Sequence, residues 1–428
     1  MKNRNSLANC LAYALLFILP VTVYYAVAGN QFMTAWDDGW MVFNRHTYGG
    51  ITLHNLSDIF SETNNGQYSP VNQTIYTALY SLFGMNPRPF HLVSLLWHVI
   101  NVFLVYAFTK KLLGLREKEN IKPVSITAFF TAVLFAIHPI NVESIAWISA
   151  SKIPVYTLFG LSALICYMQY VNSGRKRLLA TSFFLFILSF GCKEQASVLP
   201  LALPLIDRFA GRNFRDKKMW LEKIPFLVFV LVAGVYTMSL RNHAGIQYLA
   251  DYPLWQRLFF ASYSITEYLI KLAVPVKLLY LYPFPMVPGD DLPLNFYIYP
   301  FIVAAMVGAA IYYRKHKLMV FGALFFLLNI FFTLHIVSMS RICMFADRYV
   351  YLSGIGFFIP VVRYCVKYFL RLSKHKRIIG GIMVSIYLLY LAGYAMKRVE
   401  VWHDNKSLRK EIIELLDKRE QIQKVEKK

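Results

Sequence analysis

The sequence predicts an all-α polytopic membrane protein with about eleven transmembrane helices and one further helix that is re-entrant or interfacial. Of its 428 residues, 57% are hydrophobic and only 16% are charged, a balance that is rare in soluble domains. Several windows of about 18 or more residues carry no charged side chain, which suffices for a helix to cross the hydrocarbon core. The clearest are residues 90–109, 153–171, 296–313, 318–340 and 378–396. None alternates in hydrophobicity, as the strands of an outer-membrane barrel would.

Composition also separates this chain from other classes of protein. The five cysteines lie mostly in apolar segments, which favours packing over a disulfide framework. The net charge of +22 could indicate nucleic-acid binding, but the basic residues cluster between the apolar windows, as in cytoplasmic loops that face anionic lipids. We therefore expect the lipid bilayer as a partner, and no nucleic acid.

The basic runs set the orientation of the chain, because positive charge concentrates on the cytoplasmic side of membrane proteins. The basic N-terminus precedes an apolar stretch without a clean small-residue cleavage site, so we expect an uncleaved first span. The other runs placed in the cytoplasm are 110–122, 174–177, 208–218, 314–317 and 371–377. The segments that then lie outside are 30–89, 138–152, 192–195, 241–256 and 341–348.

One apolar segment, residues 257–274, does not fit a simple alternation of spans. If it crossed, the basic run 314–317 would lie outside and Asp290 and Asp291 would lie inside, both against the positive-inside rule. Three of its polar side chains also recur four residues apart, on one helical face: Tyr263, Glu267 and Lys271. We therefore expect a re-entrant or interfacial lipid-side helix here. Eleven crossings remain, with the N-terminus in the cytoplasm and the C-terminus outside.

No internal repeat or low-complexity linker divides the chain. We expect one transmembrane domain over residues 1–396, with a large first exterior loop, 30–89, that carries helices beside the membrane. Residues 397–428 are polar and rich in helix-forming side chains, so we expect a short helical tail without a repeat array.

Acidic and basic side chains gather in the exterior loops, close to the ends of spans. Polar groups are costly at membrane depth, so such residues are candidates for function. The candidates are Asp37, Asp38, His138, Glu143, Lys193, Glu194, Arg341 and Arg348. The signatures HExxH, CxxC, GxGxxG and the P-loop are absent, so no metal or nucleotide site of these kinds is predicted.

Asp37 and Asp38 follow the first span directly, between Trp36 and Trp40, and tryptophans are typical of the membrane interface. Two close carboxylates raise the pKa of one and keep the other ionised. The ionised carboxylate can take a proton from a hydroxyl as that hydroxyl attacks. The second carboxylate would orient the hydroxyl or hold a divalent metal. The alternative is a solvated acidic start of a loop.

Lys193 and Glu194 form the tip of a hairpin whose two ends carry basic, cytoplasmic flanks. Its apolar arms, 178–192 and 195–206, are too short to cross a core of about 30 Å at about 1.5 Å per residue. The tip should therefore lie recessed inside the protein. A lysine there could meet a lipid-linked phosphate, and a buried Lys–Glu pair that stabilises the hairpin is an equal alternative.

The two remaining exterior loops offer a histidine, a glutamate and two arginines. His138 and Glu143 are five residues apart and do not form a helical metal pair; a lone loop histidine is more often structural than a ligand. Arg341 and Arg348 flank the start of a span, and arginine matches phosphate oxygens with two parallel hydrogen bonds. The alternative is a salt bridge to Asp347 or an interfacial position, and Arg348 is the better candidate.

Six stretches cover most of the chain: WDDGWMVFN (36–44), the run 68–106, LFAIHPINVESIAWISASK (134–152), CKEQASVLPLALPLID (192–207), EYLIKLAVPVKLLYLYPFP (267–285) and FADRYVYLSGIGF (345–357). In this order they resemble the membrane half of the transmembrane and tetratricopeptide-repeat O-mannosyltransferases and their bacterial relatives. That family lies in the GT-C superfamily of glycosyltransferases that use lipid-phosphate sugars.

The resemblance implies an eleven-span fold with an exterior active site. It assigns the catalytic base to Asp37 and Asp38, which favours the catalytic interpretation of this pair. It places Glu143 in the same site, and Lys193 and Arg348 in the motifs that hold the donor phosphate. Eukaryotic members carry an array of tetratricopeptide repeats after the membrane domain, which this sequence lacks, so the acceptor stays open between a protein and a glycan.

We therefore expect a hexosyltransferase that moves a monosaccharide, such as mannose, from a polyprenyl-phosphate donor to an acceptor hydroxyl by inverting displacement. No cofactor is required, and a divalent metal at the aspartates and Glu143 is an alternative. A transporter or flippase of lipid-linked saccharides is another class, although the chain shows no internal symmetry. A ligase is a third class, which usually uses exterior arginine and histidine. The missing array favours a bacterial inner membrane, with the site facing the periplasm.

Overall fold

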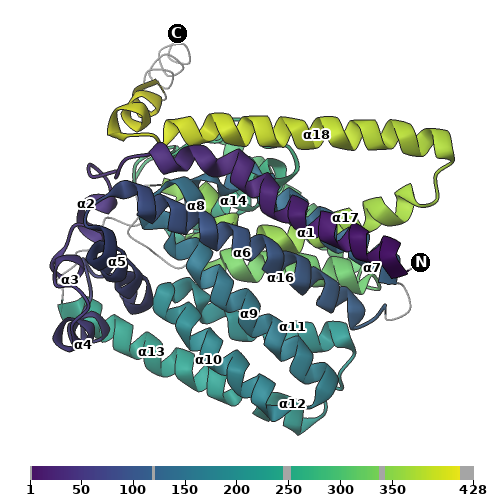
Figure 1. Cartoon of the computed structure of the whole chain (residues 1–428), viewed down its shortest axis with the longest axis horizontal. Helices are drawn as coiled ribbons and strands as arrows, with labels where there is room; N and C mark the ends of the chain where they lie inside the picture. Colours follow the sequence, from purple (N-terminus) through teal and green to yellow (C-terminus); the bar gives the residue numbers. More distant parts are fainter. Residues whose placement is uncertain (1, 118–120, 244–251, 337–342, 415–428) are drawn as a thin grey trace.

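The computed structural model describes residues 2–117, 121–243, 252–336 and 343–414 (Figure 1). Within these ranges the chain is almost entirely helical. Its single sheet pairs two short antiparallel strands, β1 (Tyr282–Pro283) and β2 (Cys343–Phe345). The all-α prediction is therefore confirmed.

Six helical segments of the described residues are long and apolar enough to span a membrane. They are Asn9–Gly29, Pro87–Gly114, Ile148–Ser173, Lys217–Leu240, Leu294–Tyr312 and Lys374–Val401. They overlap α1 (Lys2–Tyr24), α6 (Pro87–Gly114), α9 (Lys152–Ser173), α12 (Lys217–Leu221), α13 (Ile224–His243), α15 (Tyr299–Tyr312) and α18 (Lys374–Val401). A seventh is counted if α7 (Ile121–Ile137) and the segment Pro139–Ala146, bent by 53° relative to each other, form one broken span.

The predicted count of eleven spans is not confirmed, because several apolar helices are short. They are α10 (Lys176–Cys192), α11 (Leu199–Ala210), α16 (Lys317–Ile330) and α17 (Gly354–Phe369). The window 318–340, predicted as one span, contains α16 and the short 3-10 helix η6 (Phe331–Thr333), and its last residues, 337–340, lie outside the described residues.

Residues 30–89, the first loop, contain four short helices. They are α2 (Asp38–Met41), α3 (Arg45–Tyr48), α4 (Leu53–Ser61) and α5 (Pro70–Phe83). Local capping explains where two of them begin. The Asn44 side chain accepts the Thr47 backbone N–H at the start of α3, and Thr52 accepts that of Asn55 at the start of α4.

The hairpin formed by α10 and α11 has the short arms that the sequence predicts, 17 and 12 residues long. Its tip, the 3-10 helix η4 (Glu194–Val198), lies inside the protein, with Cys192 and Gln195 buried. The start of α5 covers this tip so closely that a Cβ on Gly191 would lie 2.7 Å from the Val71 side chain. The prediction of a recessed tip is thus confirmed.

The end of α18 lies beside the end of the first span. Figure 1 shows α1 and α18 running in the same direction, and the Gln31 backbone N–H donates to the His403 carbonyl at 2.8 Å. The residues after α18 therefore lie at the same end of the molecule as the first loop, as the predicted orientation requires. α18 continues past the expected domain boundary at residue 396 and ends at Val401, and residues 405–414 form another helical segment.

The segment predicted to be re-entrant or interfacial forms α14 (Leu254–Ala273), which is not among the candidate spans of the described residues. Glu267 and Lys271 form an ion pair at 3.6 Å, which confirms that they share a helical face. That face packs inward. Lys271 is buried with its Nζ 5.1 Å from the ring centroid of Tyr282, and Tyr263 stacks on Phe296. The exposed apolar side chains of this helix are Leu254, Trp255, Leu258 and Ile270.

Candidate active site

Asp38 is an internal anchor of the loop after the first span. Its carboxylate is fully buried and accepts hydrogen bonds from the backbone N–H of Met33 and of Ser149, both at 2.8 Å, and from the Ser149 hydroxyl. Burial raises the pKa of Asp38, and the charge of Asp37 adds a smaller contribution in the same direction. The two donors from Ser149 tie the first loop to the 3-10 helix η3 (Ile148–Ala150), and the donor from Met33 lies within the loop itself.

Asp37 has a different environment from its neighbour. It precedes the first turn of α2, is only half-buried, and accepts one hydrogen bond, from the Trp40 indole N–H at 3.3 Å. The adjacent carboxylates are therefore not equivalent. Asp37 presents the more accessible oxygen atoms, whereas the oxygen atoms of Asp38 are used to hold the loop.

Glu143 and Arg348 form a buried ion pair between two exterior loops. Glu143 lies in α8 (Val142–Ala146), and Arg348 lies in the 3-10 helix η7 (Asp347–Val350). The guanidinium pairs with Oε1 of Glu143, and Oε2 accepts the Arg348 backbone N–H at 2.8 Å. The considered salt bridge to Asp347 is wrong for Arg348, because Asp347 instead accepts a hydrogen bond from the Tyr282 hydroxyl at 2.8 Å.

Lys193 and Arg348 meet at one aromatic side chain. The Nζ of Lys193 lies 5.3 Å, and the Cζ of Arg348 lies 4.8 Å, from the ring centroid of Tyr349. Cations are attracted to aromatic faces at such distances. The guanidinium also lies 5.3 Å from the ring of Trp147. The hairpin tip and the last exterior loop therefore bring two cations to one aromatic cluster.

Tyr280 connects this cluster to the aspartates. Its ring packs edge-on against Trp36, the residue before Asp37, with centroids 4.8 Å apart. Burial raises the pKa of the Tyr280 phenol, which also feels the charges of Arg348, Glu143 and Asp37. Tyr280 also packs edge-on against Trp147, with centroids 6.1 Å apart, and Trp147 lies 5.3 Å from the Arg348 guanidinium. Aromatic contacts thus connect the residue before Asp37 to the cations.

Three other predicted candidates do not join this cluster in the same way. His138 is buried with both ring nitrogens engaged: Ile140 N–H donates to Nδ1, and Nε2 donates to the Leu272 carbonyl, each at 3.2 Å. It is therefore a structural residue of the loop. Glu194 begins η4, directly after Lys193 at the hairpin tip. Arg341 lies outside the described residues.

The structure adds two residues that the motifs did not single out. Trp147 is buried, and its indole N–H has no hydrogen-bond partner among the described residues. An unpaired buried donor beside Arg348 is costly unless a ligand uses it. Asp347 is buried near Glu143, and these two effects raise its pKa to about 7. Asp347 directly precedes Arg348 and Trp147 lies four residues after Glu143 in sequence, but only the fold shows their surroundings.

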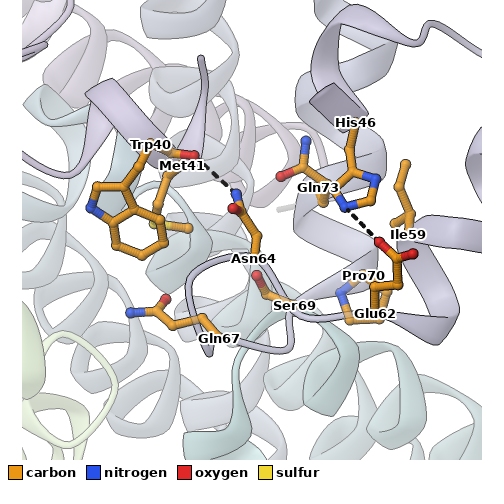
Figure 2. A pocket seen from close by; sticks show the side chains of 10 residues that line it. All are labelled: Trp40, Met41, His46, Ile59, Glu62, Asn64, Gln67, Ser69, Pro70 and Gln73. Atoms are coloured by element: carbon orange, nitrogen blue, oxygen red, sulfur yellow. Dashed lines mark hydrogen bonds and ion pairs between the residues drawn. The ribbon is translucent and has the colours of Figure 1, made fainter. Parts of the chain in front are cut away.

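A small pocket opens in the first loop (Figure 2). It is lined by Trp40, Met41, His46, Ile59, Glu62, Asn64, Gln67, Ser69, Pro70 and Gln73. Asn64 donates to the Trp40 carbonyl at 2.9 Å, and His46 lies 3.6 Å from Glu62. Because the Trp40 indole also binds Asp37, one side chain contacts both the pocket and the accessible carboxylate.

The donor set of this region is one for anions and hydroxyl groups. Among the residues that the structure describes, no three histidine, cysteine, aspartate or glutamate side chains are grouped to hold a metal ion. The cations, the free indole N–H and the half-buried carboxylate can instead bind a phosphate and accept a proton.

Sequence comparison with known proteins finds relatives of this chain. No family model matches the chain. A protein O-mannosyl-transferase of Caenorhabditis elegans is 24% identical over 401 residues, which cover 90% of this chain and 53% of the relative. The protein O-mannosyl-transferase TMTC2 of Mus musculus is 25% identical over 199 residues, covering 45% of this chain and 22% of the relative. A Drosophila melanogaster protein O-mannosyl-transferase is 25% identical over 219 residues, covering 46% and 23%.

The chain spans about half the length of the worm relative, and its resemblance to this family was predicted from motifs along most of its length. The worm match extends over 90% of the chain. The chain is similar in sequence to proteins named protein O-mannosyl-transferases, which confirms the predicted resemblance to the transmembrane and tetratricopeptide-repeat O-mannosyltransferases.

Proposed function

We propose that this protein is a membrane glycosyltransferase that transfers mannose from a polyprenyl-phosphate donor to an acceptor hydroxyl. The names of its relatives support the sugar and the reaction class. The observation that carries the proposal is the convergence of Lys193 and Arg348 on the ring of Tyr349. The charges of Asp37 and Arg348 both act on the nearby Tyr280. A lipid-linked sugar phosphate needs such cations beside a base.

The donor phosphate binds at Lys193 and Arg348. Arginine and lysine both form charge-assisted hydrogen bonds to phosphate oxygens, and burial strengthens these bonds. The Trp147 indole N–H supplies a third donor that the protein leaves unused. Glu143 holds the Arg348 guanidinium in place and offsets part of its charge, so the empty site is not left with an unpaired buried cation.

Asp37 acts as the general base. It takes the proton of the acceptor hydroxyl while the hydroxyl oxygen forms a bond to the anomeric carbon of the sugar. The bond between that carbon and the phosphate oxygen breaks, and polyprenyl phosphate leaves with its negative charge stabilised by Lys193 and Arg348. A single displacement of this kind inverts the anomeric configuration. Asp38 keeps the loop of Asp37 in place through its three hydrogen bonds.

The acceptor reaches the base from the first loop. The pocket beneath Trp40 opens there and is bordered by carboxamides that bind hydroxyl groups well, among them Asn64 and Gln67. The positive-inside rule places the first loop away from the cytoplasm. The reaction therefore takes place on the exterior side of the membrane.

The test is a donor panel. Purified protein in lipid nanodiscs is incubated with polyprenyl-phosphate mannose, polyprenyl-phosphate glucose and GDP-mannose, and released polyprenyl phosphate or GDP is measured. We expect release from polyprenyl-phosphate mannose above that of a Lys193→Met, Arg348→Gln double variant. Release from GDP-mannose alone, or equal release by wild type and variant, would overturn the proposal. Translocation of intact donor across liposomes without release would point to a transporter.

A further inference from the structure

The four residues that follow α18, Trp402–Asn405, lie against the candidate site, with Trp402 buried and His403 exposed, and we call them the C-terminal junction. Trp402 is 1% exposed although it lies at the end of a long helix whose residues 378–390 are mostly exposed. Its indole stacks on Trp147 with centroids 5.5 Å apart and an interplanar angle of 20°, and meets Tyr280 edge-on at 5.3 Å. The junction thus contacts the aromatic residues that surround Arg348.

The same junction holds the loop that leads to the aspartates. The His403 carbonyl accepts the Gln31 backbone N–H at 2.8 Å. The Asn405 side chain accepts the Ala35 backbone N–H at 3.2 Å and donates to the Thr34 hydroxyl at 3.0 Å. Three hydrogen bonds therefore fix residues 31–35 from outside the loop.

Residues 33 and 34 connect this loop to the acidic pair. The Met33 N–H donates to Asp38, and the Thr34 carbonyl approaches Gly39 so closely that a Cβ there would lie 2.3 Å from it. A shift of this loop would therefore move α2, which begins at Asp38. The contacts form a chain from Asn405 through Thr34 to the residues beside Asp37.

A second chain of contacts runs from Trp402 to the cations. Trp147 contacts both ends of this chain. Its ring stacks on Trp402 and lies 5.3 Å from the Arg348 guanidinium. Without the stacked indole of Trp402, Trp147 would lose a large buried aromatic partner. The position of Arg348 and of the unpaired Trp147 N–H depends on that partner.

We propose that the C-terminal junction is a positioning element of the active site, with one half for the base and the other half for the donor phosphate. Asn405 sets the position of Asp37 through the loop 31–35. Trp402 sets the position of Trp147 and Arg348. This inference rests on the proposed function, because it takes Asp37 as the base and Arg348 as a ligand of the phosphate.

Two variants test the division of roles by steady-state kinetics with polyprenyl-phosphate mannose. Asn405→Ala removes two hydrogen bonds at a partly exposed position, and we expect kcat to fall between about fivefold and a hundredfold with the donor KM within about twofold of wild type. Trp402→Leu should raise the donor KM about tenfold or more. Trp402→Phe keeps an aromatic ring and should bring the donor KM most of the way back to the wild-type value. Lys406→Ala, at an exposed position directly after the junction, is the control, and it should behave as wild type.

Amide hydrogen exchange separates this inference from the proposed function. We expect Asn405→Ala to speed exchange in residues 31–41 while α9 keeps the exchange rates of wild type. Unchanged exchange in residues 31–41, or equal changes of kcat and KM in both variants, would overturn the positioning role. Absence of donor turnover by wild type would instead count against the proposed function, and the exchange result would still decide whether the junction holds the loop.

Discussion

Glu143 holds Arg348 through both of its carboxylate oxygens, one on the guanidinium and one on the backbone N–H at 2.8 Å. The two residues come from different exterior loops, and Glu143 is buried. The pair therefore fastens the loop that carries Arg348 to the loop that carries Glu143.

The ion pair predicts non-additive effects on stability. Removing either partner leaves a buried charge unpaired, so Glu143→Gln and Arg348→Gln should each reduce stability, by roughly 3–5 kcal/mol. The double variant should lose clearly less than the sum of the two, because it leaves no unpaired charge. Unfolding of the four proteins in one detergent measures this. Strictly additive losses would show that the two side chains do not interact in the membrane protein.

The two aspartates should differ in what they support. Asp38→Asn replaces an acceptor of three hydrogen bonds in a buried position, and an unsatisfied buried donor costs about 1–3 kcal/mol. We expect the Tm of Asp38→Asn to fall by several degrees. Asp37→Asn, at a half-buried position with one hydrogen bond, should unfold close to the wild-type temperature. Differential scanning fluorimetry compares them, and an equal loss of Tm in both variants would contradict the assigned roles.

Lys193 should act on donor binding. Lys193→Met keeps the length of the side chain and removes a charge-assisted bond to phosphate, worth about 1.5–3 kcal/mol. The donor KM should therefore rise at least about tenfold, and Lys193→Arg should recover part of the loss. Lys176→Met, an exposed position at the other end of α10, is the control. A donor KM that changes no more in Lys193→Met than in the control would remove this lysine from the phosphate site.

Asp347 predicts a dependence of stability on pH. Its pKa is raised to about 7 in the folded protein by burial and by the charge of Glu143, against an ordinary value of 3.8. The folded state therefore holds the proton more tightly than the unfolded state between these values, so the contribution of Asp347 to stability falls as pH rises from about 4 through 7. The Tm should decrease over this range for wild type.

Asp347→Asn is the control for this dependence. An amide keeps the acceptor for the Tyr282 hydroxyl but does not ionise. The variant should lose a large part of the decrease in Tm between pH 5 and pH 8. If its pH profile coincides with that of wild type, the decrease comes from other groups, and the raised pKa of Asp347 has no consequence for stability.

The sequence predicts the membrane class, the short arms of the hairpin at Lys193 and the grouping of Asp37 with distant cations, because these rest on apolar length and on motifs. It does not predict that Asp38 is buried or that Glu143 pairs with Arg348. Those features depend on side-chain contacts between loops far apart in the chain, and hydrophobic periodicity contains no information about them. The stack of Trp402 on Trp147 escapes sequence reasoning for the same reason.

The number of spans is a feature for which the sequence predicts more than the structure confirms. The count of eleven treats apolar stretches such as those of α11 and α16 as crossings, although these two helices are too short to be recognised as spans by length. Short helices packed inside a larger membrane domain need not each match the thickness of the bilayer. Whether each short apolar helix crosses the membrane therefore depends on how the helices pack, which the sequence alone does not show.

The central claim is that Asp37 is the base of a transfer reaction from a lipid-phosphate sugar. The most direct test compares wild type with Asp37→Asn in a single-turnover reaction with saturating polyprenyl-phosphate mannose, with donor binding measured in parallel. We expect release of polyprenyl phosphate to slow by on the order of a hundredfold or more, as for loss of a general base, while the donor Kd stays within about twofold of wild type. Release by the variant at the wild-type rate, with donor bound equally well, would contradict the account.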